Sequence, residues 1–181
     1  MSTYTGSVPQ HFVCTHAEAR KHIAEHDQFY IWVCGCRASR GGCSHSRMDV
    51  CLAFSPEFAH EDQRPRPATR EEALEIVVEA DTKGLVARPF RNAADPTQLD
   101  GICFCCPECC HYFNHPEDPC DKGSLRELTN REQCSDCGAC VSVCHFGARE
   151  LVDGQLVIDG DKCYGCGLCV DACPTGCIAM K

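Results

Sequence analysis

The first regular pattern of polar and apolar positions covers residues 15–26. These residues are mostly polar, with Ala19 and Ile23 as a narrow apolar face. Thr15 precedes Glu18 by three positions, the spacing of a capping box that satisfies exposed amides in the first helical turn. The pattern therefore predicts a helix that begins after Thr15.

A second and clearer helix is predicted over residues 70–83. Thr69 and Glu72 form another capping box, and Gly84 is placed to end the helix. Its apolar residues recur at helical spacing and predict a buried stripe: Ala73, Ile76, Val77 and Ala80.

Short strands are predicted on either side of this helix and near the end of the chain. Phe29 to Val33 is aromatic and β-branched, and Leu85 to Ala87 is a short apolar run. The strand, helix, strand order indicates a small α/β or α+β unit. Residues 151–158 predict a hairpin, because Asp153-Gly154 suits a type I′ turn between apolar strands.

Proline, aspartate and glycine concentrate between Asn114 and Asn130, which predicts a linker. The chain then divides into an N-terminal domain over 1–113, a linker over 114–131 and a C-terminal domain over 132–181. The expected fold class is α+β.

Composition adds one dominant fact, which is that 20 of the 181 residues are cysteine. The formal net charge of −9 disfavours nucleic acid and anionic membranes as partners, and favours redox partners with basic docking surfaces. No stretch approaches the roughly 20 apolar residues of a membrane-spanning helix. The first residues lack the pattern of a signal peptide, so we expect a cytoplasmic protein without disulfides.

Eight cysteines form two copies of the run C-x-x-C-x-x-C-x-x-x-C. The first copy is Cys134, Cys137, Cys140 and Cys144; the second is Cys163, Cys166, Cys169 and Cys173. Residues 133–181 thereby resemble bacterial-type ferredoxins, which bind two [4Fe-4S] clusters. The duplicated run is much more specific than the isolated pairs typical of zinc sites, and no C-x-x-C-H haem motif occurs.

The resemblance implies crossed ligation, in which the fourth cysteine of each run serves the other cluster. Cluster 1 would be held by Cys134, Cys137, Cys140 and Cys173. Cluster 2 would be held by Cys163, Cys166, Cys169 and Cys144. One departure is His145, which follows the first run where these ferredoxins usually have proline.

Nine further cysteines lie in two fields of the N-terminal domain. The first field is Cys34, Cys36, Cys43 and Cys51; the second is Cys103, Cys105, Cys106, Cys109 and Cys110. With the residues around them, over Val33 to Cys110, they resemble poorly characterised ferredoxin-linked proteins in which a cysteine-rich region precedes a 4Fe-4S domain. That resemblance implies a metal site and redox partners but no substrate.

Ligand grouping in these fields stays open. In one scheme the first field holds one [4Fe-4S] cluster, and four of the five cysteines at 103–110 hold another. In a mixed scheme each field contributes to both clusters, since adjacent side chains such as Cys105 and Cys106 point to opposite faces of an extended chain. Zinc is the alternative metal.

Other residues near the fields are weaker candidates. His45 and His111 are possible iron ligands, and Arg37, Arg40 and Arg47 could offset cluster charge. Three cysteines are expected to ligate nothing: Cys14, Cys120 and Cys177.

The predicted function is a multi-cluster, polyferredoxin-like protein that relays single electrons between redox partners, a role typical of anaerobic metabolism. One alternative is an enzyme or electron-transferring subunit with a catalytic, atypically coordinated N-terminal cluster. Another is a ferredoxin with a zinc-stabilised docking domain. No catalytic residues are assigned.

Overall fold

A seven-stranded sheet organises the N-terminal part of the computed structural model, which describes residues 8–56 and 65–181. The strand order is β4-β2-β3-β6-β5-β1-β7, and the neighbours are antiparallel except for β1 with β7. The strands are β1 (His11–Phe12), β2 (Phe29–Trp32), β3 (Cys51–Ala53), β4 (Arg66–Ala68), β5 (Val86–Arg91), β6 (Leu99–Cys105) and β7 (Cys120–Asp121).

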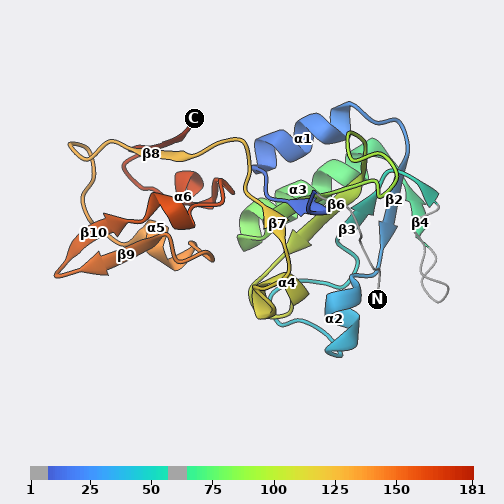
Figure 1. Cartoon of the computed structure of the whole chain (residues 1–181), viewed down its shortest axis with the longest axis horizontal. Helices are drawn as coiled ribbons and strands as arrows, with labels where there is room; N and C mark the ends of the chain where they lie inside the picture. The colour runs from blue at the N-terminus through green and yellow to red at the C-terminus, as the bar shows by residue number, and fades with distance from the viewer. Residues whose placement is uncertain (1–7, 57–64) are drawn as a thin grey trace.

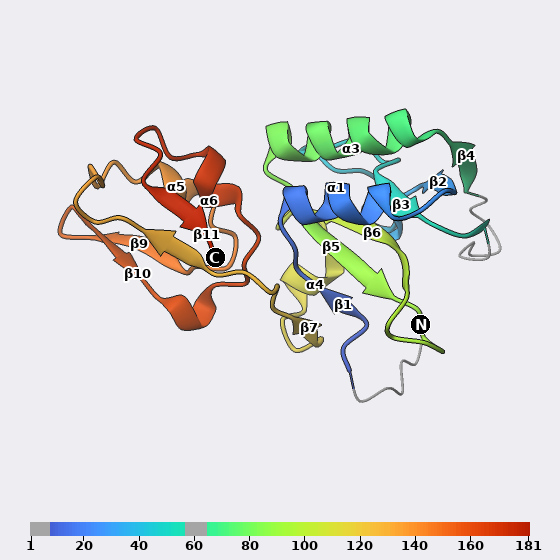
Figure 2. The same ribbon diagram turned by 90° about the horizontal axis from the view of Figure 1, so that it is seen from above.

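Two longer helices, α1 (His16–Ala24) and α3 (Arg70–Lys83), lie side by side over one face of this sheet (Figure 2). Both predicted helices are confirmed, because the side chains of Thr15 and Thr69 each complete the capping box. Gly84 ends α3 with a positive φ of 61°, which glycine adopts without strain. The four residues of the predicted apolar stripe are all buried.

The two faces of the sheet differ in chemistry because side chains alternate along each strand. One face packs on α1 and α3 through apolar residues: Phe29, Ile31, Leu52, Ala87, Ile102 and Phe104. The intervening positions carry Trp32, Cys51, Arg88, Phe90, Cys103 and Cys105. Short helices α2 (Gly35–Ser39) and α4 (His111–Asn114) lie on this second side (Figure 1).

Strand β5 is longer than the predicted Leu85 to Ala87 and continues through Pro89 to Arg91. The Ala87 carbonyl accepts from Cys14 N–H, and Arg91 N–H donates to the Gln10 carbonyl. Pro89 lies between Ala87 and Arg91, so its nitrogen faces the β1 side of the strand. Strand β1 is only two residues long. The missing proline N–H therefore interrupts no ladder with β6, and the strand can continue.

The C-terminal part contains two small sheets and short helices. Strands β9 (Arg149–Val152) and β10 (Gln155–Ile158) form the predicted hairpin, with φ of 51° at Asp153 and 78° at Gly154. The remaining elements are β8 (Glu127–Thr129), α5 (Ala139–Ser142), the 3-10 helix η2 (Gly160–Lys162), α6 (Leu168–Asp171) and β11 (Ile178–Met180). Strand β8 pairs with β11.

The segment predicted as a linker, 114–131, contributes a strand to each part. Strand β7 completes the large sheet, and β8 belongs to the C-terminal part (Figure 1). Between them Gly123 N–H donates to the Tyr164 carbonyl at 2.9 Å, and Ser124 donates to Glu18 at 2.8 Å. These bonds fix the C-terminal part against the N-terminal one.

Among the described residues, no helix combines the length and the apolar character needed to cross a membrane.

We predict that Gly101→Ala destabilises the sheet. A Cβ at this position would lie 2.1 Å from the Leu52 carbonyl oxygen and 2.6 Å from Phe90 Cζ. The expected loss is about 1–3 kcal/mol, the usual cost of overpacking, seen as a lower urea midpoint by far-ultraviolet circular dichroism. Gly160→Ala is the control, because a Cβ at that position would meet no atom within 4 Å. Equal midpoints for the two variants would contradict the prediction.

Candidate iron-sulfur sites

The eight cysteines of the duplicated run gather around two separate cavities. One cavity is lined by Cys134, Cys137, Cys140 and Cys173. The other is lined by Cys144, Cys163, Cys166 and Cys169. The fourth cysteine of each run thus lies with the first three of the other run, as crossed ligation requires.

Both runs have the same backbone conformation at equivalent positions. Gly138 and Gly167 each follow the second cysteine and begin α5 and α6, with φ of 76° and 82°. Gly147 and Gly176, three residues after each fourth cysteine, also have positive φ. These turns curve the chain around each cavity and leave backbone N–H groups near the sulfurs, which fits the donor requirements of a cubane cluster.

A buried arginine lies between the two C-terminal cavities. The Arg149 side chain is 2% exposed, donates to Cys140 Sγ at 3.4 Å, and forms an ion pair with Glu127. Burial alone would lower the pKa of Arg149, but the thiolates of Cys169 and Cys140 raise it. The guanidinium therefore stays charged and offsets negative charge at both sites.

In the N-terminal part, the second face of the sheet borders a cavity of about 390 Å³. Its wall contains eight of the nine cysteines of the two fields: Cys34, Cys36, Cys51, Cys103, Cys105, Cys106, Cys109 and Cys110. Six of these thiols influence one another's pKa values in series, which indicates that neighbours in the series lie close together. The order is Cys103, Cys51, Cys34, Cys36, Cys110 and Cys105. The backbone N–H of His111 also donates to Cys36 Sγ at 3.4 Å.

Cys43 lies in a different group. Its sulfur is 3.6 Å from Cys106 Sγ, which is 3.3 Å from Cys109 Sγ. The adjacent pairs 105–106 and 109–110 are therefore divided between two groups, with Cys105 and Cys110 in one and Cys106 and Cys109 in the other. These contacts favour the mixed scheme, in which each field contributes to both sites.

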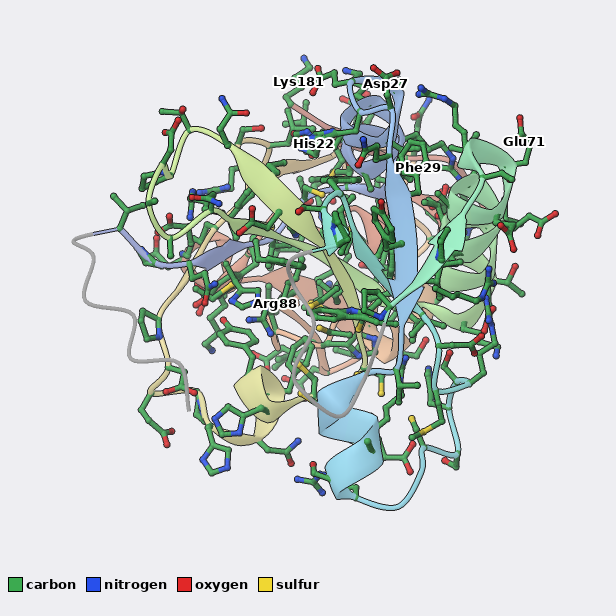
Figure 3. All side chains as sticks on the ribbon, turned by 90° about the vertical axis from the view of Figure 1, so that its right-hand side faces the viewer. His22, Asp27, Phe29, Glu71, Arg88 and Lys181 are labelled. Atoms are coloured by element: carbon green, nitrogen blue, oxygen red, sulfur yellow. The ribbon has the colours of Figure 1, made fainter. Side chains whose placement is uncertain are left out.

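Arg88 lies beside Cys105 and Cys110 of the six-thiol group. It is buried inside the domain, whereas Glu71 and Asp27 project from its surface (Figure 3). It donates to Cys110 Sγ at 3.3 Å and covers the Tyr112 ring at 4.4 Å. Burial acts to lower the pKa of Arg88, but the thiolates of Cys105 and Cys110 raise it. The residue is a permanent positive charge beside the cavity.

Of the three arginines predicted to offset cluster charge, only Arg37 is buried beside the thiols. It is 1% exposed, lines the cavity, and donates to the Phe104 carbonyl at 3.0 Å. Arg47 instead pairs with Glu79 and Asp49, and Arg40 is exposed.

Other predicted candidates have different partners. His45 Nε2 donates to the Lys83 carbonyl at 2.8 Å, and His111 Nε2 is 2.8 Å from Asp118. Cys14 is buried in the core between the sheet and its helices. Cys120 is half-buried, and burial raises its pKa to about 11. Cys177 lies in the cavity of cluster 1, with its sulfur 3.5 Å from Cys173 Sγ.

Four aromatic rings connect the N-terminal cavity to the second C-terminal cavity. Tyr112 lines the first, while Phe146 and Tyr164 line the second. Phe146 and Tyr164 stack at 4.4 Å, and Tyr112 lies 6.3 Å from Tyr164 and 5.4 Å from Phe113. His145 adds a hydrogen bond between the two parts of the chain, since its Nε2 donates to the Gly84 carbonyl at 2.9 Å.

Sequence reasoning missed Arg88, Arg149 and this aromatic cluster. None of these residues forms a recognisable motif with its neighbours in sequence. Their roles depend on partners farther along the chain; Arg88 and Cys105, for example, are 17 residues apart. The one available signal was Arg88 itself, a charged residue within an apolar strand.

The family model for the 4Fe-4S dicluster domain matches residues 133–177. No curated protein and no solved structure is significantly similar to the chain. The matched residues contain both cysteine runs, so the C-terminal part is a ferredoxin-type domain that binds 4Fe-4S clusters. Together with the high cysteine content, the match indicates an iron-sulfur electron-transfer protein. The N-terminal cysteine fields lie outside the match.

We predict that His145→Ala loosens the contact between the two parts of the chain. Loss of the bond to Gly84 should cost about 1 kcal/mol. Hydrogen exchange of peptides from 114–131, measured by mass spectrometry, should then be about fivefold faster. His115→Ala is the control, because among the described residues its ring contacts nearby exposed groups, Glu117 and His111. Unchanged exchange in His145→Ala would show that this bond does not hold the contact.

Proposed function

We propose that the protein is a multi-cluster electron relay, in which an N-terminal [4Fe-4S] cluster exchanges single electrons with the two clusters of the ferredoxin-type domain. The observation that carries this proposal is the packed aromatic cluster, buried at Tyr112 and half-buried at its other rings, between the N-terminal cavity and the cavity of cluster 2. A short, packed connection favours electron tunnelling between two sites.

The N-terminal cavity suits such a cluster. Six neighbouring thiols lie in its wall: Cys34, Cys36, Cys51, Cys103, Cys105 and Cys110. Four of these are enough to bind a cubane cluster. Arg88 offsets part of the negative charge that four thiolates bring to a buried site. The Cys36 sulfur already receives a backbone N–H bond, the kind of contact that stabilises bound thiolate.

The arrangement supports one order of sites along the relay. The N-terminal cavity contacts the aromatic cluster, the cluster 2 ligands follow, and the cluster 1 ligands lie beyond them. Cys137, a ligand of cluster 1, is exposed. A partner can therefore exchange electrons at cluster 1 while another exchanges them near α2 and α4.

Charge favours partners with basic docking surfaces, since the chain carries −9 before any cluster charge is added. Association should weaken as salt increases. The proposed chemistry moves electrons only, so no substrate bond is made or broken.

The composition of the intact protein tests the relay. Anaerobically purified protein should contain about twelve iron and twelve sulfide per chain, the content of three cubane clusters. Low-temperature electron paramagnetic resonance of the reduced protein should show a third signal coupled to the ferredoxin pair. About eight iron atoms would limit the protein to an ordinary two-cluster ferredoxin.

Cys166→Ala should interrupt the relay at cluster 2. We expect the loss of about four iron atoms and slower electron exchange between the N-terminal cluster and cluster 1 in freeze-quench experiments. Cys177→Ala is the matched control, since Cys177 lies in the neighbouring cavity but outside the proposed ligand set. Equal exchange rates in both variants would contradict the relay.

Arg88→Gln should lower the reduction potential of the N-terminal cluster, because loss of a buried positive charge disfavours the added electron. We expect a shift of tens of millivolts, given that about 59 mV corresponds to a tenfold change in a one-electron equilibrium. Redox titration followed by paramagnetic resonance measures it. Arg40→Gln removes the same charge at an exposed position and should leave the potential nearly unchanged. Identical shifts would mean that only net charge matters.

A further inference from the structure

The group formed by Cys43, Cys106 and Cys109 has the geometry of a site for a single metal ion. Its three sulfurs lie within 4.8 Å of one another, with two separations of 3.6 and 3.3 Å. A tetrahedral zinc ion with Zn–S bonds of about 2.3 Å places its sulfurs about 3.8 Å apart. The thiolates of a cubane each bind a different iron and stand farther apart, so the observed spacing fits one ion better.

An exposed carboxylate, Glu108, lies beside one of these three sulfurs. Glu108 Oε2 lies 3.6 Å from Cys43 Sγ, within the turn that joins Cys106 to Cys109. Ser44 holds the same carboxylate, with its backbone N–H donating to Oε1 at 3.4 Å and its hydroxyl donating to Oε2 at 2.8 Å. Carboxylate oxygen is an ordinary zinc ligand, and a C-x-x-C turn is the usual way to supply two sulfurs.

The surroundings of these ligands support a bound ion. The backbone N–H groups of His45 and Ser46 are directed at Cys43 Sγ, and the Arg37 guanidinium also contacts this sulfur. Three thiolates, one carboxylate and Zn²⁺ sum to a charge of −2, part of which buried Arg37 offsets. Such outer contacts orient the ligands of structural metal sites.

We propose that Cys43, Cys106 and Cys109 bind a structural zinc ion, and that Glu108 turns from Ser44 to supply the fourth ligand. The ion ties the loop between α2 and β3, which carries Cys43, to the segment between β6 and α4. It thereby holds one wall of the N-terminal cavity, because Cys105 and Cys110 flank the two zinc ligands in sequence. The site goes beyond the electron relay and does not depend on it.

Zinc and iron content of anaerobically purified protein, with zinc-edge X-ray absorption, test this assignment. We expect about one zinc per chain, bound by three sulfurs at about 2.3 Å and one oxygen at about 2.0–2.2 Å. Less than a tenth of a zinc per chain, or a shell of four sulfurs, would overturn it. The absorption measurement uses the unaltered protein, so it decides the question even if a variant fails to fold.

A pair of variants separates the zinc site from the cluster site. Cys43→Ala should lose at least four-fifths of the zinc and keep its iron, whereas Cys34→Ala should lose iron and keep its zinc. Loss of about four iron atoms in Cys43→Ala, with no change in zinc, would assign Cys43 to a cluster and overturn the proposal. A wild-type protein with about eight iron atoms and one zinc would instead reject the N-terminal cluster while supporting the zinc site.

Discussion

The alternation of side chains across the central sheet is the constraint on which the rest of the N-terminal part depends. One face packs against α1 and α3 in an ordinary apolar core, and the other presents cysteines and a buried arginine to a cavity. Apolar burial stabilises the first face. The second carries a smaller apolar cluster around Tyr112, and metal–thiolate bonds at the proposed sites would add to its stability, as in other small metal-binding domains.

Buried arginines make this arrangement compatible with the dense cysteine content. Arg37, Arg88 and Arg149 are each below 8% exposed and contact thiols or backbone carbonyls near them. A buried cation without a partner would be costly, and so would a buried group of thiolates. Each side therefore requires the other, and the same charges favour reduction of a neighbouring cluster.

The connection between the two parts of the chain is likewise built from few interactions. The Gly123 N–H donates to the Tyr164 carbonyl, and the His145 ring donates to the Gly84 carbonyl. Four rings fill the space between the two parts: Tyr112, Phe113, Phe146 and Tyr164. His145 replaces the proline usual in bacterial-type ferredoxins, and this ring provides an N–H that proline lacks. A ferredoxin-type domain is thereby held in a fixed position beside a second thiol-rich cavity.

Local chemistry allowed the sequence to determine much of this protein. Capping boxes at Thr15 and Thr69, the stripe from Ala73 to Ala80 and the Asp153-Gly154 turn depend on residues a few positions apart, so helices and hairpin followed from them. The duplicated cysteine run identified the iron-sulfur domain because its spacing reflects the shape of one cofactor. Only the tertiary structure decided which distant residues meet. Cys43 lies with Cys106 and Cys109 although 63 residues separate Cys43 from Cys106, and Arg88 reaches Cys105 and Cys110 through strand pairing. The length of β5 depended on how short β1 is, and the linker segment became part of two sheets. Such contacts arise from sheet register and packing between elements, which no local spacing in the chain records.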